Sequence, residues 1–308
     1  MTLEQILADI KSDRVKKVIV DTDTCNEMDD QYAIAHAMGS DRLNVLSINA
    51  APYFYKQGGG YAEGMERSYN EILRVLKMCH KEGEYPVFRG SSETIHETGK
   101  AVDSPAARNI IKTAMESDEI IYVLALGAIT NVTSAILLEP RIKEKICVIW
   151  LGGNCLEKEG EIDEYNLVQD YRAGQLLLNC GVKLIMLPAM GPDKTLGTQV
   201  LSVTREELEE KIPGDTDAAV FFRYTLPEAF DKPTREYHNG AWIRIIWDIA
   251  APAALSVPDA FEYKIIPAPV FADNGAYAFD STREKIIFMI KLDRDTVFED
   301  MYRAIAKF

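Results

Sequence analysis

The sequence predicts an α/β protein with a doubly wound, mostly parallel open sheet, and three observations lead to that fold class. Strand-like and helix-like patterns alternate along the chain with short connections. Several strand-like runs, such as residues 120–126, are apolar throughout, which is typical of strands covered on both faces. The 308 residues suffice for one large domain, and no repeat or linker interrupts them. We therefore expect a single domain over residues 1–308.

The elements follow from runs of β-branched residues for strands and from one-sided apolar spacing for helices. The expected strands cover residues 17–20, 43–50, 85–88, 120–126, 146–151, 182–187, 262–266 and 285–290. The expected helices lie within residues 1–17, from 31, at 64–79, 105–117, 132–138, 171–179, 205–211, 217–230 and 240–255, and from 297. No strand separates the helical patterns at 205–211 and 217–230. We therefore expect a helical excursion over about residues 203–255 that covers the strand ends.

Four aspartates follow the first strand within ten residues: Asp21, Asp23, Asp29 and Asp30. In a parallel sheet this is the carboxyl edge, where open α/β proteins bind their ligands. Carboxylates this close repel one another, and a cation relieves the repulsion. Oxygen ligands without a nearby His or Cys favour a hard ion, Ca²⁺ or Mg²⁺. The alternative is that Asp29 caps the following helix and that the other three are solvated loop charges.

Polar residues that follow the later strands are expected at the same edge of the sheet. They are Thr130, Asn131, Asn154, Glu164 and Asn166. Asp248 is different, because it lies in the apolar run Ile245-Ile-Trp-Asp-Ile-Ala-Ala, where an unpaired carboxylate costs several kcal/mol. Two interpretations stand: a helical pair with Arg244 four residues earlier, or a further ligand for the same ion. We favour the second.

Composition limits the classes of partner and compartment. The net charge of −14 argues against nucleic-acid phosphate as the main partner. No apolar run approaches the length of a membrane span, and the first seventeen residues lack the features of a signal peptide. The five cysteines show no C-x-x-C pairing, which favours a reducing compartment, and we expect a cytoplasmic protein. Cys25 lies among carboxylates that raise the pKa of a thiol, so we interpret it as a small loop residue.

Several motifs resemble those of the nucleoside hydrolase superfamily, the calcium-dependent N-ribohydrolases that include the enzymes preferring inosine and uridine. The strand-end motif Asp-x-Asp-Pro-Gly-x-Asp-Asp is similar to Asp21-Thr-Asp23-Thr-Cys-Asn-Glu-Met-Asp29-Asp30. The turn Leu-Gly-Pro-Leu-Thr-Asn is similar to Leu126-Gly-Ala-Ile-Thr130-Asn. The Gly-Gly and Glu-Phe-Asn motifs are similar to Gly152-Gly and Glu164-Tyr-Asn166, with Asp170 nearby. Trp247-Asp248 stands where the family has His-Asp.

The resemblance implies a site and a reaction. Ca²⁺ would be bound by Asp23, Asp30, Asp248 and the backbone carbonyl of Thr130, with Asp21 supporting them from behind. The ribose hydroxyls would be held by Asp29, Glu164 and Asn166, and Asn154 is a further candidate for the substrate. A calcium-bound water, activated by Asp23, would attack the anomeric carbon and release free base and ribose. The family also implies purine or pyrimidine salvage, a nucleoside as the small-molecule partner, and a homodimer or homotetramer.

Two departures from the family pattern affect the leaving group and the sugar site. The first loop is two residues longer, so that Asn26 and Glu27 intrude on the expected sugar site. The His that serves some members as leaving-group acid is replaced by Trp247, which we assign a catalytic role through stacking on the base. Tyr237 and Trp242 are alternative stacking partners, although Trp242 also suits the core or the pocket wall. We interpret His238 as a solvated loop residue.

Two other functions compete with nucleoside hydrolysis. Haloacid-dehalogenase-like phosphatases, which use Mg²⁺, also begin with a strand and Asp-x-Asp-x-Thr, but the Gly-Asp-x-x-x-Asp pair that they need is not found at the later strand ends. A calcium-dependent protein that binds a ribosyl ligand with little turnover is the second alternative. The identity of the base stays open, because the loops expected to bind it, residues 52–61 and 221–242, carry no diagnostic motif.

Overall fold

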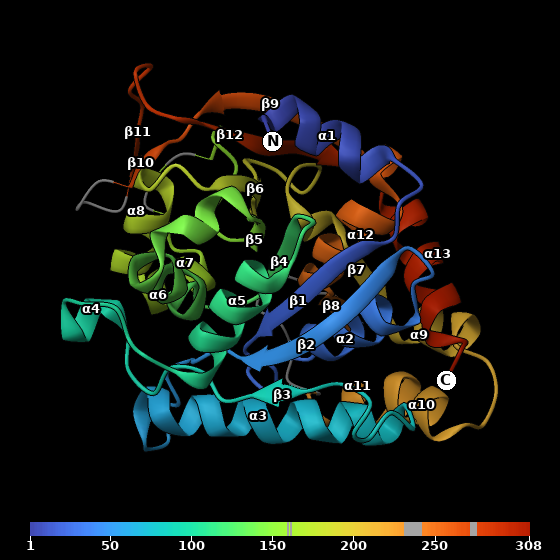
Figure 1. The fold of residues 1–308 in the computed structure, drawn as a ribbon. Helices are drawn as coiled ribbons and strands as arrows, with labels where there is room; N and C mark the ends of the chain where they lie inside the picture. Colours follow the sequence, from blue (N-terminus) through green and yellow to red (C-terminus); the bar gives the residue numbers. More distant parts are fainter. Residues whose placement is uncertain (159, 161, 231–241, 272–275) are drawn as a thin grey trace.

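The computed structural model describes residues 1–158, 160, 162–230, 242–271 and 276–308. An eight-stranded sheet runs through the molecule in the order β3-β2-β1-β4-β5-β6-β12-β9 (Figure 1). Every adjacent pair of its strands is parallel except β12 and β9, which are antiparallel. The predicted doubly wound, mostly parallel sheet is therefore confirmed.

The strands of this sheet lie close to the predicted positions. They are β1 (Lys16–Thr22), β2 (Leu43–Ala50), β3 (Val87–Phe88), β4 (Ile121–Ala125), β5 (Ile146–Leu151), β6 (Lys183–Leu187), β9 (Phe261–Pro267) and β12 (Lys285–Leu292). Two short antiparallel pairs lie outside it: β7 (Ser202–Thr204) with β8 (Ile243–Ile245), and β10 (Val270–Phe271) with β11 (Tyr277–Ala278).

Helices cover both faces of the sheet (Figure 1). On one side lie α1 (Leu3–Lys11), α2 (Asp29–Gly39), α3 (Gly60–Met78), α12 (Ala250–Ser256) and α13 (Arg294–Ile305), whose apolar residues share one cluster. On the other lie α5 (Pro105–Glu116), α6 (Thr130–Leu138) and α8 (Tyr171–Asn179). The remaining helices are α4 (Ile95–Thr98), α7 (Tyr165–Gln169), α9 (Arg205–Lys211), α10 (Asp217–Val220) and α11 (Leu226–Ala229), with a π-helical turn at Phe221–Thr225.

The core divides into two layers because successive strand side chains point to opposite faces. In β4, Tyr122 and Leu124 belong to the cluster beside α2, α12 and α13. Ile121 and Val123 belong to the cluster beside α5, α6 and α8. Both sets are fully buried, which explains why the run is apolar at every position.

Of the helix predicted over residues 240–255, the part over residues 250–255 is confirmed, whereas the described residues before it do not form an α-helix. Residues 243–245 form β8, a short 3₁₀ helix follows at Trp247–Ile249, and α12 begins only at Ala250. The partner of β8 is β7, far earlier in the chain, and a continuous apolar run does not reveal such a distant pairing. The helical excursion therefore contains a strand pair as well as helices.

None of the described helices combines the length with the apolar character that a membrane crossing requires.

Candidate active site

Buried carboxylates gather where β1 ends and α2 begins. Asp21 is part of β1, Asp23 follows the strand directly, and Asp29 and Asp30 are the first two residues of α2. Asp248 joins them from the 3₁₀ helix that precedes α12. These residues form an acid cluster of four carboxylates: Asp23, Asp29, Asp30 and Asp248. Between 2% and 4% of the surface of each of these four residues is exposed.

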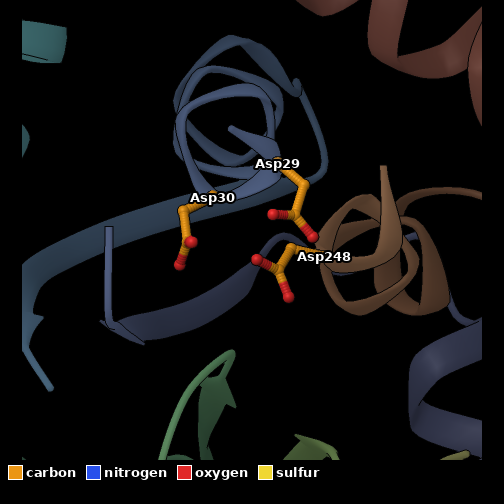
Figure 2. Close-up of side chains that lie close together, drawn as sticks. All are labelled: Asp29, Asp30 and Asp248. Carbon is orange, nitrogen blue, oxygen red and sulfur yellow. The ribbon is translucent and has the colours of Figure 1, made fainter. Parts of the chain in front are cut away.

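Three members of the acid cluster, Asp29, Asp30 and Asp248, converge on a shared space. One carboxylate oxygen from each of Asp29, Asp30 and Asp248 lies within 4.8 Å of the others. Figure 2 shows the carboxylate of Asp29 directed towards that of Asp248, with Asp30 beside them. The carboxylate of Asp29 also accepts a hydrogen bond from the backbone N–H of Asp248. Segments more than two hundred residues apart in the chain thus form one site.

The predicted alternatives for Asp29 and Asp248 do not match this geometry. Asp29 is the first helical residue, and Met28 occupies the N-cap position without a capping side chain. The helical pair between Arg244 and Asp248 is wrong, because the backbone between them is a strand followed by a 3₁₀ turn. Arg244 donates hydrogen bonds to the carbonyl oxygens of Ile243 and Phe230 instead.

The carboxylates of the acid cluster are buried and close together, which favours either their protonation or the binding of a cation between them. Burial, followed by the charges of Asp30 and Asp29, raises the pKa of Asp23 well above its usual value. Burial raises the pKa of Asp30 to about 7, although the hydroxyl of Thr22 donates a hydrogen bond to its carboxylate. The pKa of Asp248 is raised by burial and then by Asp29 and Asp30. Closely placed buried carboxylates cannot all ionise without positive charge nearby.

The oxygen atoms available here fit a hard divalent ion. Among the described residues, Oδ2 of Asp23 and Oδ1 of Asp248 are buried and have no hydrogen-bond partner. Unpaired buried oxygens are costly, and an ion that accepts six to eight oxygen ligands would satisfy them. Asp21 is also buried with Oδ1 unpaired, while its Oδ2 accepts a hydrogen bond from Asn131 at 3.0 Å. Burial raises the pKa of Asp21 to about 7.

A cleft of about 200 Å³ opens above the acid cluster. Three of the predicted site residues outside the cluster, Glu164, Asn166 and Trp247, are among those that line it, together with Asn26 and Glu27 of the first loop. The other described residues that line it are Leu126, Leu151, Asp163, Tyr165, Ala189 and Met190. The long first loop thus reaches the cleft, and its intrusion on a sugar site stays a prediction.

Glu164 and Asn166 are held rigidly by main-chain groups. Glu164 caps α7 and accepts hydrogen bonds from the backbone N–H groups of Gly153, Asn166 and Leu167 at 2.8–2.9 Å. Burial nevertheless raises the pKa of Glu164 to about 7. The amide of Asn166 donates to the carbonyl oxygens of Leu126 and Leu151. Both side chains therefore occupy fixed positions at the wall of the cleft.

Asn154 and Thr130 lie near the cleft but are not among the residues that line it. The side chain of Asn154 accepts a hydrogen bond from the backbone of Met190 and donates one to Asp163. Thr130 is the first residue of α6, and its hydroxyl donates to the buried carboxylate of Asp170 at 2.7 Å. Both residues connect elements around the cleft.

Asn131 and Gly127 act on the site from behind, and sequence reasoning did not assign them these roles. Asn131 donates to Asp21 and to the carbonyl of Ala50, while its Oδ1 accepts from the backbone N–H of Ser91. It thus ties α6 to the ends of β1 and β2. Gly127 lies so close to Asp23 that a Cβ there would come within 2.8 Å of the carboxylate. The only sequence signal for either residue was its place in the Leu126–Asn131 turn.

The aromatic alternatives from the sequence divide between described and undescribed residues. Trp242 packs against the main apolar cluster, with the guanidinium groups of Arg205 and Arg244 about 5 Å from its ring. It is not among the residues that line the cleft, which fits the interpretation as core. Tyr237 and His238 lie outside the described residues.

Comparisons with known proteins agree with the resemblance found in the sequence. The family profile described as "Inosine-uridine preferring nucleoside hydrolase" matches residues 18–299. The chain is 25% identical over 299 residues to the inosine-uridine preferring nucleoside hydrolase of Crithidia fasciculata, covering 90% of this chain and 88% of that one. It is 27% identical over 205 residues to the pyrimidine-specific ribonucleoside hydrolase RihB of Escherichia coli, covering 58% of this chain and 60% of RihB.

Solved structures agree in fold. The purine-preferring ribonucleoside hydrolase from Gardnerella vaginalis superposes with a TM-score of 0.73 at 19% identity, covering 94% of this chain and 98% of that one. The chain spans about three fifths of the length of the first curated relatives that it matches. The family profile, in contrast, matches nearly all of it, from the first strand into the last helix. The chain belongs to the inosine-uridine preferring nucleoside hydrolase family.

Proposed function

We propose that the protein hydrolyses the N-glycosidic bond of a ribonucleoside or a related N-ribosyl compound and releases free base and ribose. The observation that carries this proposal is the acid cluster at the floor of the cleft, with two buried oxygens that lack hydrogen-bond partners among the described residues. Such a floor suits a divalent ion together with a sugar diol, because a hard ion accepts both carboxylate and hydroxyl oxygens. The family match supports the same reaction class.

Calcium is the proposed ion, held by Asp23, Asp30, Asp248 and the backbone carbonyl of Thr130, with Asp21 behind them. The all-oxygen donor set is the type that Ca²⁺ prefers, and its flexible coordination tolerates the irregular spacing of an acid cluster drawn from two segments. When bound, the ion supplies positive charge that makes a water molecule more acidic and orients the sugar hydroxyls. It also offsets burial, the main cause of the raised pKa values in the cluster, and the repulsion between its carboxylates.

The side chains have separate roles in the proposed reaction. Asp23 accepts the proton of the attacking water, since its Oδ2 is buried and uncommitted among the described residues. Asp29, Glu164 and Asn166 hold the ribose hydroxyls from the floor and wall of the cleft. The remaining carboxylates stabilise the positive charge that develops on the ribose as the bond to the base breaks.

Trp247 and Asn154 complete the proposed set. Trp247 lines the cleft beside Asp248 and offers an aromatic face to the base. Asn154 bonds to Met190 and Asp163, two residues that line the cleft, and we keep it as a sugar-binding candidate. A nucleoside is the proposed partner, and purine or pyrimidine salvage is the proposed role.

Asp23→Asn tests the proposal, because the variant keeps the shape of the side chain but removes its charge. We expect base release to fall by about 100-fold or more, the contribution typical of a positioned base, and calcium uptake in calorimetry to weaken. The matched control is Asp103→Asn, which removes an exposed carboxylate paired with Arg108 and should change neither quantity. Full activity in the Asp23 variant, or in protein stripped of divalent ions, would contradict the mechanism.

The same experiment separates the alternatives. Calcium and ribosyl-ligand binding without base release would favour the binding protein with little turnover. Release of phosphate from a phosphorylated sugar would favour the phosphatase, which the family match already argues against. A panel of purine and pyrimidine nucleosides, assayed for free reducing sugar, identifies the base.

Location and assembly are part of the proposal. All five cysteines are free, which is consistent with the expected cytoplasmic compartment. A homodimer or homotetramer is proposed from the family resemblance, and sedimentation of the purified protein measures it.

A further inference from the structure

The first loop turns sharply directly after Asp23. The backbone N–H of Asn26 donates to the carbonyl of Asp23 at 3.1 Å, which closes a four-residue turn. Cys25, the third residue of the turn, has φ of 87°, the left-handed conformation that glycine adopts without strain. Thr24 and Cys25 thus occupy the positions of the family's Pro-Gly pair. The turn brings Asn26 to the cleft, which it helps to line.

Tyr165 fixes the orientation of the Asn26 side chain. Its hydroxyl, from the first residue of α7, donates to Oδ1 of Asn26 at 3.1 Å. A phenol that donates to the amide oxygen leaves both N–H donors of the amide nitrogen to face other groups. The other amide of the cleft wall, that of Asn166, has both donors engaged by carbonyl oxygens. Asn26 therefore offers amide donors to a ligand where Asn166 does not.

The depth of the cleft decides which part of a substrate Asn26 meets. The acid cluster at the floor is almost fully buried, whereas Asn26, Tyr165 and Trp247 are half-buried and form the mouth. A ribose held at the floor by its hydroxyls must direct its base towards the mouth. The base then lies beside the Trp247 ring and within the region that Asn26 faces.

Breaking the bond to the base creates a need for a hydrogen-bond donor. The electron pair of the C–N bond moves onto the base, and negative charge develops on its ring nitrogens and carbonyl oxygens. A positioned donor stabilises such charge more in the transition state than in the ground state. In this chain Trp247 stands where some family members have an acidic His, and the Asn26 amide at the mouth of the cleft is a further donor that the departing base can use.

We propose that Asn26 donates a hydrogen bond from its amide nitrogen to the departing base, and that Tyr165 is the positioning residue that holds the amide in this orientation. This inference rests on the proposed function. The oxygen of water bonds to the anomeric carbon, its proton passes to Asp23, and the C–N electron pair leaves with the base. Asn26 keeps its protons, and the base takes a proton from solvent water at the open mouth. Asp23 then releases its proton to solvent, which neutralises the hydroxide formed there.

Leaving-group dependence tests the proposal in the calcium-loaded protein. The substrates are inosine, uridine and 4-nitrophenyl β-D-ribofuranoside, whose nitrophenolate leaves as a stable anion without a donor. Asn26→Asp retains an oxygen to accept from Tyr165 but has no amide donor. We expect it to lower kcat/KM for the cleaved nucleoside by about 100-fold, the loss typical of one removed donor, and to leave the nitrophenyl riboside within about 3-fold. Asn26→Ala should give the same pattern.

Two further variants distinguish positioning from folding. Tyr165→Phe removes only the hydroxyl, and we expect kcat for the nucleoside to fall less than in Asn26→Asp, with the nitrophenyl riboside unaffected. A purely structural role of Tyr165 would lower kcat for both substrates together. Asn70→Ala, which changes an exposed amide on α3, is the matched control and should leave both substrates unchanged.

The outcomes separate this inference from the proposed function. If the wild-type protein cleaves a nucleoside and Asn26→Asp loses both substrates equally, or neither, the role of Asn26 is overturned while the proposed function stands. If the wild-type protein cleaves neither the nucleosides nor the nitrophenyl riboside, both proposals fail.

Discussion

The position of Asp23 depends on a residue that has no side chain. A Cβ added to Gly127 would lie 2.8 Å from both Cγ and Oδ1 of Asp23. The peptide is held by two hydrogen bonds and cannot easily move away. The indole N–H of Trp150 donates to the carbonyl oxygen of Gly127, and the backbone N–H of Leu126 donates to the backbone carbonyl oxygen of Asp21. Gly127→Ala should therefore displace the Asp23 carboxylate from the proposed ion.

We expect Gly127→Ala to lower calcium affinity and the rate of base release, and also to lower the free energy of unfolding. Overpacking costs about 1–3 kcal/mol of unfolding free energy, measurable by urea denaturation. Ala128→Gly is the matched control, since it changes the neighbouring buried residue without adding an atom near Asp23. Normal calcium affinity in the Gly127 variant would show that ion binding does not depend on the position of the Asp23 carboxylate.

At the scale of single residues, the sequence predicted the charged residues of the site better than the residues that hold them in place. The acids after the first strand were recognisable because four of them follow an apolar run directly. The role of Asn131, which bridges Asp21 and Ser91, needs the spatial meeting of a strand, a helix and a loop that are far apart in the sequence. Asn154 was expected to bind substrate, yet its visible contacts are to Met190 and Asp163. Local patterns cannot show such contacts between distant segments.

The half-buried carboxylate of Asp300 joins α13 to α2 and α12, the two helices that adjoin the acid cluster. His36, on α2, contacts Asp300 of α13 at 2.7 Å, and the hydroxyl of Ser256, on α12, donates to the same carboxylate. The helix α2 begins with Asp29 and Asp30, while α12 follows Asp248. Burial acts to raise the pKa of Asp300, but the hydrogen bonds from His36 and Ser256 hold it below its usual value.

Asp300→Ala should lower the free energy of unfolding by about 2–3 kcal/mol at neutral pH, because His36 and Ser256 lose a charged acceptor. A carboxylate with a lowered pKa stabilises the fold fully above the pKa that it has in the unfolded chain, about 4. This difference in unfolding free energy should therefore shrink as the pH falls from about 4 towards the lower pKa of the folded state. Urea denaturation at several pH values measures it. Asp295→Asn, an exposed ion pair on the same helix, should change stability by less than about 0.5 kcal/mol. Equal effects of the two variants would rule out this role for Asp300.

At the scale of elements, most strands and helices were predictable, and the failure over residues 240–255 has a physical cause. Buried strands and buried helices both read as apolar runs, and only length and flanking residues separate them. Residues 243–245 gain their strand conformation by pairing with residues 202–204, which no local propensity reports. The 3₁₀ turn that follows places Asp248 beside Asp29 and Asp30, so the mispredicted segment carries a proposed ligand of the ion.

The whole molecule brings together acids from both ends of the chain because parallel strands deliver their following loops to one edge. That rule allowed the sequence to predict one cleft, although Asp248 follows no strand of the central sheet. The order of the strands was not predictable, since many orders satisfy the same alternation of elements. The single domain over residues 1–308 stays a prediction.

The buried acids of the site link the stability of the whole molecule to pH. Without an ion, burial raises the pKa of Asp21, Asp30 and Glu164 to about 7 in each case. In the unfolded chain these groups lose their protons near pH 4. Between these values the folded state binds more protons than the unfolded state, so the stability of the ion-free protein should fall as the pH rises from about 4 to 7.

Calcium should reverse that trend, because it binds the ionised carboxylates and releases their protons. We expect the increase in melting temperature caused by calcium to be small at pH 5 and to grow towards pH 8. At one hundred times the dissociation constant it should correspond to about 2.7 kcal/mol of stabilisation. Thermal unfolding with calcium or with a chelator measures it, and Asp248→Asn should remove most of the difference. A calcium effect that is equal at both pH values, or larger at pH 5, would mean that the ion binds elsewhere than among these buried acids.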